Sequence, residues 1–91
     1  MTKSLSVIIP CLNAESFIYK KVIKLNKKLK NLKIKFEIIV INDGSKDNTL
    51  RELLRLKKKL KSVKCVNYKR NKGKSYIIKK NINKTRFNNV V

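Results

Sequence analysis

The chain has 91 residues, 42% of them apolar, which suffices for one small folded domain and argues against global disorder. Its formal net charge is +20, from 25 basic and 5 acidic residues, and it contains no histidine. No apolar run approaches the roughly 20 residues of a membrane-spanning helix, and the N-terminal stretch lacks the features of a secretory signal.

The charge excess has two interpretations, a polyanionic partner or a drift in codon composition. The basic residues are 21 lysines and 4 arginines, beside 11 asparagines and 11 isoleucines, as AT-rich codons produce. Proteins that recognise nucleic-acid bases favour arginine, so an anionic membrane surface is preferred over nucleic acid as the polyanion. Both interpretations stay open at this point.

The two cysteines, Cys11 and Cys65, lie far apart in the sequence. Without histidine, a structural zinc site is excluded, and we interpret both cysteines as small apolar residues. Free thiols suit a reducing compartment, so the predicted location is the cytoplasm or the cytosolic face of a membrane.

Strand patterns and helix patterns alternate along the chain. Residues 4–9 form a branched apolar run that ends at Pro10, which predicts a strand buried on both faces. Residues 36–41 repeat this pattern and lead into the polar turn 42–45. Between them, a helix face is predicted from Ile18, Val22, Leu25, Leu29 and Leu32.

A second helix is predicted after the polar turn. Asp47 or Thr49 is the expected N-cap, and Thr49 with Glu52 fits a capping box. The residues expected to face inward are Leu50, Leu53, Leu54 and Leu60.

The last third of the chain continues the alternation. Residues 63–68 predict a third strand, and residues 89–91 resemble the start of a fourth. Gly73 opens a third helix that carries Tyr76, Ile77, Ile78 and Ile82. The order predicts an α/β fold, a Rossmann-like parallel sheet with alternating helices and right-handed crossovers, over a single domain at residues 1–91.

In open α/β sheets, ligands bind at the carboxyl ends of the strands. Two loops leave those ends, residues 10–15 and 42–47, and three of the five acidic residues lie in them: Glu15, Asp43 and Asp47. A carboxylate there can accept hydrogen bonds from a nucleobase or a ribose. The alternative is a polar turn that only caps the second helix, and the residues alone favour that alternative.

A third loop follows the third predicted strand. Arg70, Lys72 and Lys74 surround Gly73 at the start of a helix, which could hold a diphosphate. The signal is weak in so lysine-rich a chain, and its position at a strand end is what strengthens it.

Together these stretches resemble the family 2 glycosyltransferases. The matching segments are residues 6–13 (SVIIPCLN), 37–49 (EIIVINDGSKDNT) and 70–74 (RNKGK). Residues 73–82 are most similar to the branch that transfers glucose or mannose to dolichyl or polyprenyl phosphate. The resemblance implies a hexosyl-transferring enzyme of the GT-A fold with a UDP- or GDP-linked donor and a lipid-phosphate or saccharide acceptor. Residues 1–91 would be its N-terminal nucleotide-sugar-binding part, truncated at the fourth strand.

The resemblance also implies a role for each matching residue. Pro10 and Asn13 would shape the first nucleotide loop, and Glu15 would approach the ribose. Asp43 would accept a hydrogen bond from uracil or guanine. The turn and the phosphate side of the cleft would be formed by Gly44, Ser45, Arg70, Asn71, Gly73 and Lys74.

The chain departs from the family after the second helix. The family holds Mg²⁺ or Mn²⁺ with an Asp-x-Asp after the fourth strand and uses a carboxylate base further on, but no acidic residue follows Glu52. We therefore assign no metal or catalytic residue and expect no turnover by this chain alone. Smaller departures occur at Asn42, where the family usually has Asp, and at Ser75 and Asn81, where it often has Gly.

Two alternatives to a transferase stay open. The chain could bind a nucleotide without turnover, or it could be a basic protein that binds anionic membrane or nucleic acid. Because the fourth strand lies beside the first in the implied fold, we also expect self-association through an unpaired edge of the first strand.

Overall fold

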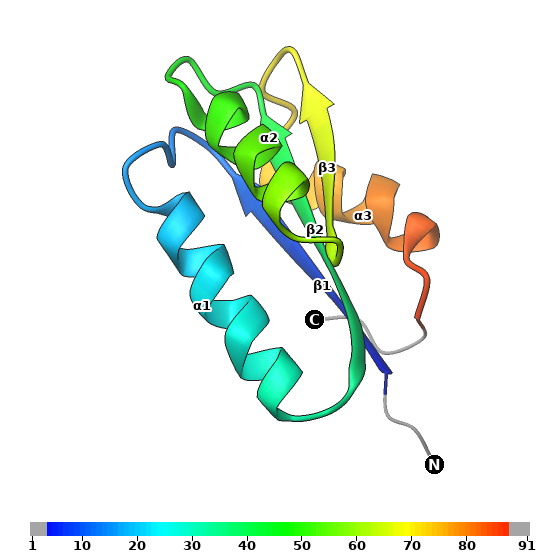
Figure 1. Cartoon of the computed structure of the whole chain (residues 1–91). Helices are drawn as coiled ribbons and strands as arrows, with labels where there is room; N and C mark the ends of the chain where they lie inside the picture. Colours follow the sequence, from blue (N-terminus) through cyan, green and yellow to red (C-terminus); the bar gives the residue numbers. More distant parts are fainter. Residues whose placement is uncertain (1–3, 88–91) are drawn as a thin grey trace.

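The computed structural model describes residues 4–87, which form three parallel strands alternating with three helices (Figure 1). The elements are β1 (Ser4–Cys11), α1 (Ile18–Asn31), β2 (Lys35–Asp43), α2 (Thr49–Lys59), β3 (Val63–Tyr68), α3 (Lys74–Asn81) and a 3₁₀ turn, η1 (Ile82–Lys84). The sheet order is β1-β2-β3, with β2 in the centre. The predicted α/β fold is thus confirmed, while the predicted start of a fourth strand at residues 89–91 lies outside the described residues.

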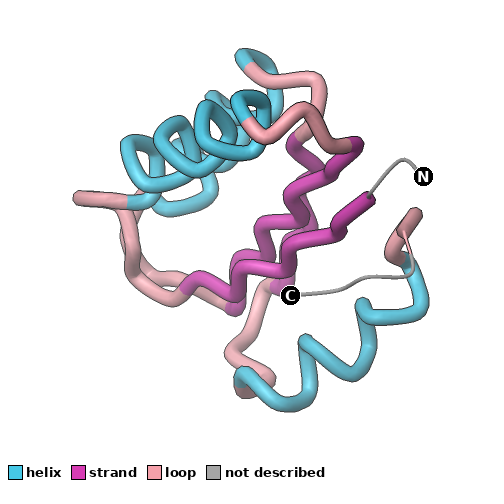
Figure 2. The backbone as a smooth tube through the Cα atoms, turned by 90° about the horizontal axis from the view of Figure 1, so that it is seen from below, coloured by secondary structure: helices cyan, strands magenta, loops and turns pink. Residues whose placement is uncertain are grey.

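The helices cover both faces of the sheet, α1 and α2 on one side and α3 on the other (Figure 2). Successive side chains of β2 alternate between the two sides, as the period of a strand requires. Ile38 and Val40 pack in the larger core beneath α1 and α2, whereas Ile39 and Ile41 pack against Ile77 of α3.

Burial of the strands follows their position in the sheet. β2 is buried from Glu37 to Asp43, as expected of a central strand. The prediction that residues 4–9 are buried on both faces is wrong for β1, most of which is half-buried. Within residues 4–87, β1 pairs only with β2, and such an edge strand can contain Pro10, which lacks an N–H, without losing a ladder bond.

The predicted helix faces need three corrections. Leu32 is 66% exposed because it falls beyond the last turn of α1. Leu54 is 51% exposed, since it is rotated by about 100° from the buried Leu53. Leu56, which the sequence analysis did not select, is fully buried in its place. Tyr76 lies on α3 as predicted and is exposed, whereas Ile82 is exposed and lies in η1, just beyond the end of α3.

The predicted caps of the second helix are also wrong. α2 begins at Thr49 with Asn48 as its N-cap, and Asn48 makes no side-chain capping bond. Asp47 lies one position earlier, where its Oδ1 accepts the Thr49 backbone N–H at 2.9 Å. The capping box does not form because Glu52 instead pairs with Arg55 at 2.7 Å.

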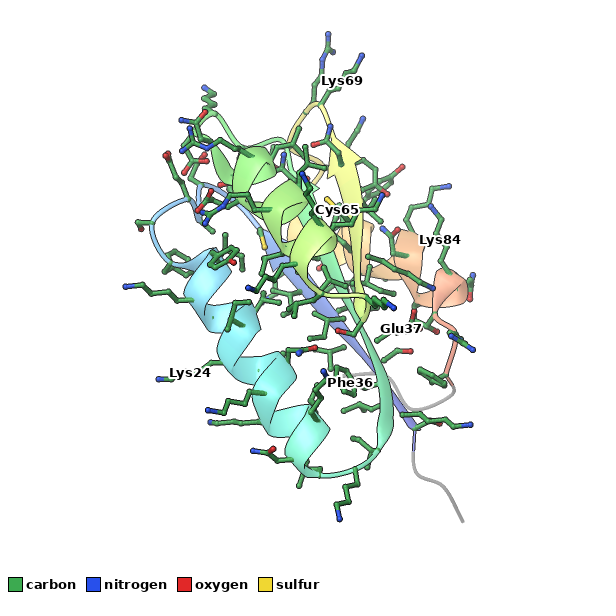
Figure 3. The ribbon with its side chains drawn as sticks, in the orientation of Figure 1. Lys24, Phe36, Glu37, Cys65, Lys69 and Lys84 are labelled. Carbon is green, nitrogen blue, oxygen red and sulfur yellow. The ribbon has the colours of Figure 1, made fainter. Side chains whose placement is uncertain are left out.

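A buried carboxylate fixes the end of the described chain beneath the sheet. Glu37, labelled in Figure 3, is 3% exposed and accepts hydrogen bonds from the Ser6 hydroxyl at 2.6 Å and from the backbone N–H of Arg86. The Lys64 ammonium lies 2.9 Å from its other oxygen. Ser6 Oγ in turn accepts the Phe87 N–H at 3.2 Å. This network holds the segment after η1 against the amino-terminal halves of β1 and β2.

Candidate functional site

The carboxyl ends of the three strands meet at one end of the sheet. A hollow of about 280 Å³ opens there, lined by Pro10, Cys11, Leu12, Asp43, Asn71, Gly73 and Lys74. Five of the ten residues predicted to bind the nucleotide therefore lie around one hollow. Cys11 and Leu12 were not selected from the sequence, although both belong to the loop that the sequence analysis identified.

Asp43 joins the end of β2 to the loop between β3 and α3. Its side chain is buried, and its two oxygens accept the backbone N–H groups of Lys72 at 2.7 Å and of Gly73 at 3.1 Å. Because a carboxylate has about four acceptor positions, Asp43 can still accept a bond from a ligand. Its predicted contact with a nucleobase stays a prediction.

Gly44 permits a close approach between the same two loops. Its φ is +71°, and a Cβ at this position would lie 2.3 Å from the Asn71 nitrogen and 2.5 Å from the Arg70 carbonyl carbon. A side chain would therefore overlap the backbone of the neighbouring loop. The sequence analysis gave Gly44 the role of shaping a turn and could not detect this contact.

The loops after β1 and β2 are joined by reciprocal hydrogen bonds. The Asn13 N–H donates to Ser45 Oγ at 2.9 Å, and Asn13 Oδ1 accepts the Lys46 N–H at 2.9 Å. The next residue, Ala14, donates its N–H to the Thr49 hydroxyl at 2.8 Å. Asn13 and Ser45, both predicted to shape nucleotide loops, thus contact each other directly.

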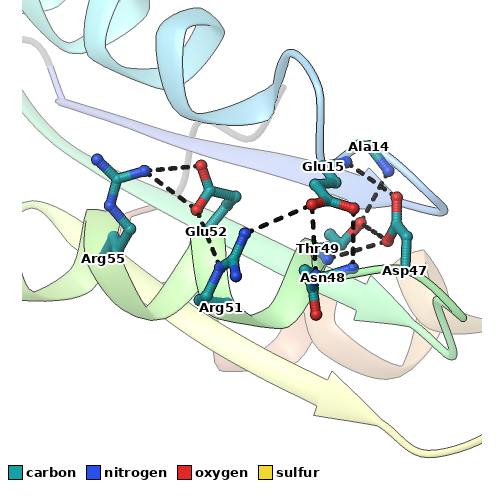
Figure 4. A network of polar contacts seen from close by, with 8 residues as sticks. All are labelled: Ala14, Glu15, Asp47, Asn48, Thr49, Arg51, Glu52 and Arg55. Carbon is teal, nitrogen blue, oxygen red and sulfur yellow. Dashed lines mark hydrogen bonds and ion pairs between the residues drawn. The ribbon is translucent and has the colours of Figure 1, made fainter.

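The acidic residues of these two loops take part in the same network, shown in Figure 4. Glu15 accepts the Asn48 N–H at 3.2 Å and forms an ion pair with Arg51 at 3.4 Å. The Glu15 N–H donates to Asp47 Oδ2 at 3.2 Å. Hydrogen bonds from Thr49, first from its hydroxyl, hold the pKa of Asp47 below its usual value. Neither carboxylate lines the 280 Å³ hollow, so the predicted approach of Glu15 to a ribose stays untested.

The described residues do not fit a divalent-metal site. Asp43 and Asp47 bind backbone groups of different loops, and among residues 4–87 no three or more Asp, Glu, His or Cys side chains cluster. Cys11 is no candidate nucleophile, since burial raises the pKa of its thiol to about 11 and keeps it protonated.

A larger hollow of about 730 Å³ lies beside α2 and the edge of β3. Of the ten predicted residues only Ser45 lines it, and Arg70 lines neither hollow. At its border Asn42 donates from Nδ2 to Asn67 at 2.8 Å and accepts the Ser45 N–H at 3.2 Å. We favour the smaller hollow because three loops from three strand ends converge on it, as ligand sites of open α/β sheets require.

Comparison with known proteins identifies the family of the chain. The sequence model of the family described as Glycosyl transferase family 2 matches residues 6–86. An uncharacterized glycosyltransferase of Synechocystis sp. is 38% identical over 91 residues, which cover 100% of this chain and 29% of the relative.

Two further relatives carry related names. A Bacillus subtilis protein named "Putative glycosyltransferase CsbB" is 39% identical over 75 residues, covering 81% of this chain and 22% of the relative. The dolichyl-phosphate beta-glucosyltransferase of Dictyostelium discoideum is 36% identical over 85 residues, covering 86% of this chain and 26% of the relative. The chain therefore spans less than a third of the length of each of these three relatives.

Proposed function

The chain belongs to glycosyl transferase family 2, and from this membership we propose that residues 1–91 are a partial domain that binds the nucleotide of a nucleotide-sugar donor. The donor would be UDP- or GDP-linked. The whole protein would transfer a hexose to a lipid-phosphate or saccharide acceptor. The similarity to a dolichyl-phosphate beta-glucosyltransferase supports the lipid-phosphate acceptor.

The observation that supports this proposal most strongly is the convergence of Asp43, Asn71, Gly73 and Lys74 on one hollow at the strand ends. Lys74 supplies a positive charge and, as the first residue of α3, lies at a helix N-terminus. Both features favour a diphosphate. At about 280 Å³ the hollow lies near the lower end of ligand-pocket volumes, so it would take the diphosphate or the base rather than a whole donor.

A second candidate function is nucleotide binding without turnover. It is favoured by the use of Glu15, Asp43 and Asp47 within the loop network, because each of these carboxylates already accepts a hydrogen bond from a backbone N–H. Family enzymes take their metal and base from residues that this chain does not match. We assign no catalytic residue to the described part of the chain.

The predicted locations and other partners are not addressed by the relatives. The part of the chain that the structure describes has no helix long and apolar enough to cross a bilayer. The cytosolic location, the membrane surface and self-association stay predictions, and nucleic acid stays an unfavoured partner.

Calorimetric titration of the chain with UDP, GDP and ADP tests the proposal. We expect UDP or GDP to bind more tightly than ADP, which carries the same phosphates. Lys74→Ala should weaken the preferred nucleotide by about 10-fold, the loss of one charged hydrogen bond. Lys72→Ala is the matched control, because Lys72 is an exposed lysine two residues before Lys74 that does not line the hollow.

Two results would count against a specific site. One is equal affinity for all three nucleotides that fades together with added salt, which indicates attraction by net charge. The other is an equal loss of affinity in both lysine variants.

A further inference from the structure

The outer side of α1 carries a row of lysines. α1 packs Ile18, Val22 and Leu29 into the core, which leaves the opposite side of the helix in solvent. On that side three exposed lysines recur at helical spacing, and we call them the lysine face: Lys20, Lys24 and Lys27. Figure 3 shows Lys24 pointing away from the sheet, on the side opposite Lys84.

α2 extends this basic surface beside α1. Its residues on the outer side are Arg51, Arg55 and Lys58, all exposed. The Arg55 guanidinium lies 4.2 Å from the centre of the Tyr19 ring, which ties the two helices together. α1 has no acidic residue, and the single acid of α2, Glu52, is already paired with Arg55 and Arg51.

The part of the chain that the structure describes offers the lysine face no acidic partner. Within residues 4–87, none of its three lysines forms an ion pair. A hollow of about 550 Å³ runs along it, with an apolar floor formed by Tyr19 and Ile23. Large apolar side chains are exposed at both ends of α1, Phe17 at 51% and Leu32 at 66%.

We propose that the lysine face, with Lys58 of the neighbouring α2, docks on an anionic lipid bilayer. Each lysine close to such a surface strengthens binding by about five-fold, and the contributions of several lysines on the same side of the molecule combine. Exposed Phe and Leu at the two ends of α1 can enter the interface between head groups and acyl chains, a contact that a nucleic acid does not offer. Lysine also lacks the planar fork with which arginine recognises bases.

Co-sedimentation of the 91-residue chain with vesicles tests this docking surface. The vesicles contain phosphatidylcholine alone or with 30% phosphatidylserine (about one lipid in three, to give the surface potential of an anionic leaflet). We expect binding only to the anionic vesicles. Replacing all three residues of the lysine face by Gln should weaken that binding by about 100-fold.

A charge-matched triple variant is the control. Lys79, Lys80 and Lys84 are exposed lysines on the α3 side, and their replacement by Gln removes the same charge from the opposite surface. We expect this variant to keep vesicle binding within about three-fold of the unmodified chain. Equal losses in both triple variants would mean that net charge alone acts, and the proposal would be overturned.

A second variant separates membrane from nucleic acid. Leu32→Ser should weaken binding to anionic vesicles while leaving the affinity for a DNA duplex unchanged, since only the bilayer takes up an apolar side chain. Tighter binding to the duplex than to the vesicles, with no effect of Leu32→Ser on either, would also overturn the proposal. Far-ultraviolet circular dichroism of each variant checks that the substitution leaves the fold intact. These outcomes do not depend on nucleotide binding at the strand ends.

Discussion

The Asp43 carboxylate accepts the backbone N–H of Gly73 at 3.1 Å, across 30 positions of the chain. With the bond from Lys72, this contact fixes the loop that carries Arg70 and leads into Lys74 of α3 to the end of the central strand. Asp43 thus acts as a positioning residue for the basic loop, whatever it also contacts in a ligand. The acid at the end of β2 and the glycine before α3 form one structural unit.

Replacing Asp43 by Asn should loosen this loop. An amide presents one NH₂ group to two backbone donors, so at least one partly buried N–H loses its acceptor, at a cost of about 1 kcal/mol in the free energy of unfolding. Urea denaturation measures that cost. Hydrogen exchange should accelerate at the Lys72 and Gly73 amides. Unchanged exchange there would show that the carboxylate does not hold the loop.

Gly44→Ala should damage the same region through overlap. The new Cβ would fall 2.3 Å from the Asn71 nitrogen, and we expect a loss of about 2–4 kcal/mol from overpacking together with the positive φ. Gly73→Ala is the control, since its φ is +93° but nothing lies within 4 Å of a Cβ there. The amide chemical shifts of Arg70 and Asn71 should change in Gly44→Ala and remain unchanged in Gly73→Ala. The reverse pattern would contradict the contact.

The sequence predicted the architecture well because it depends on patterns that are local in the chain. Buried strands, helical spacing and turn residues each lie within about 15 positions, so β1 to α3 could be placed before the structure was known. Burial of single residues was less predictable. Leu53 and Leu54 fit the same apolar pattern, and only the position of the helix on the sheet shows which one is buried.

The candidate site was predictable in its location but not in its contacts. The rule that ligands bind at strand ends identified the loops around Pro10, Asp43 and Gly73. No sequence pattern shows that Asn13 forms a hydrogen bond with Ser45, because the two residues are 32 positions apart and meet only in the folded chain. The acidic residues that the sequence analysis predicted to contact a ligand therefore form hydrogen bonds between loops.

Buried Glu37 should make stability fall in acid. Burial opposes ionisation of Glu37, but hydrogen bonds from Ser6 and Lys64 and from the backbone N–H of Arg86 outweigh it and hold the pKa below its usual value. A carboxyl with a lowered pKa in the folded state stabilises the fold above the unfolded pKa of about 4.3 and loses that effect as pH falls further. Unfolding by urea at a series of pH values between about 7 and 3 measures the loss.

Glu37→Gln is the variant that isolates this effect. It removes the titrating group, keeps the size of the side chain, and should flatten the stability profile below the usual glutamate pKa of about 4.3. Glu52→Gln serves as the control, since the partner of Glu52, Arg55, is exposed and the pair lies at the surface, and it should leave the slope largely unchanged. A steep acid loss that persists in Glu37→Gln would assign the effect to other groups.

We expect two chains to associate through the edges of their β1 strands only when salt screens their positive charge. Within residues 4–87 the strand partner of β1 is β2, and from Leu5 to Cys11 the other edge can offer backbone donors and acceptors to a second strand. Two chains of charge +20 repel each other at low ionic strength, and salt shortens the range of that repulsion to about 3 Å at 1 M. Sedimentation velocity should therefore show a monomer in dilute buffer and larger species as sodium chloride is added. Amide protons of β1 that point away from β2 should become protected from exchange over the same range of salt.

A monomer at every salt concentration would show that this edge is not an association surface, whereas larger species without added protection in β1 would place the contact elsewhere.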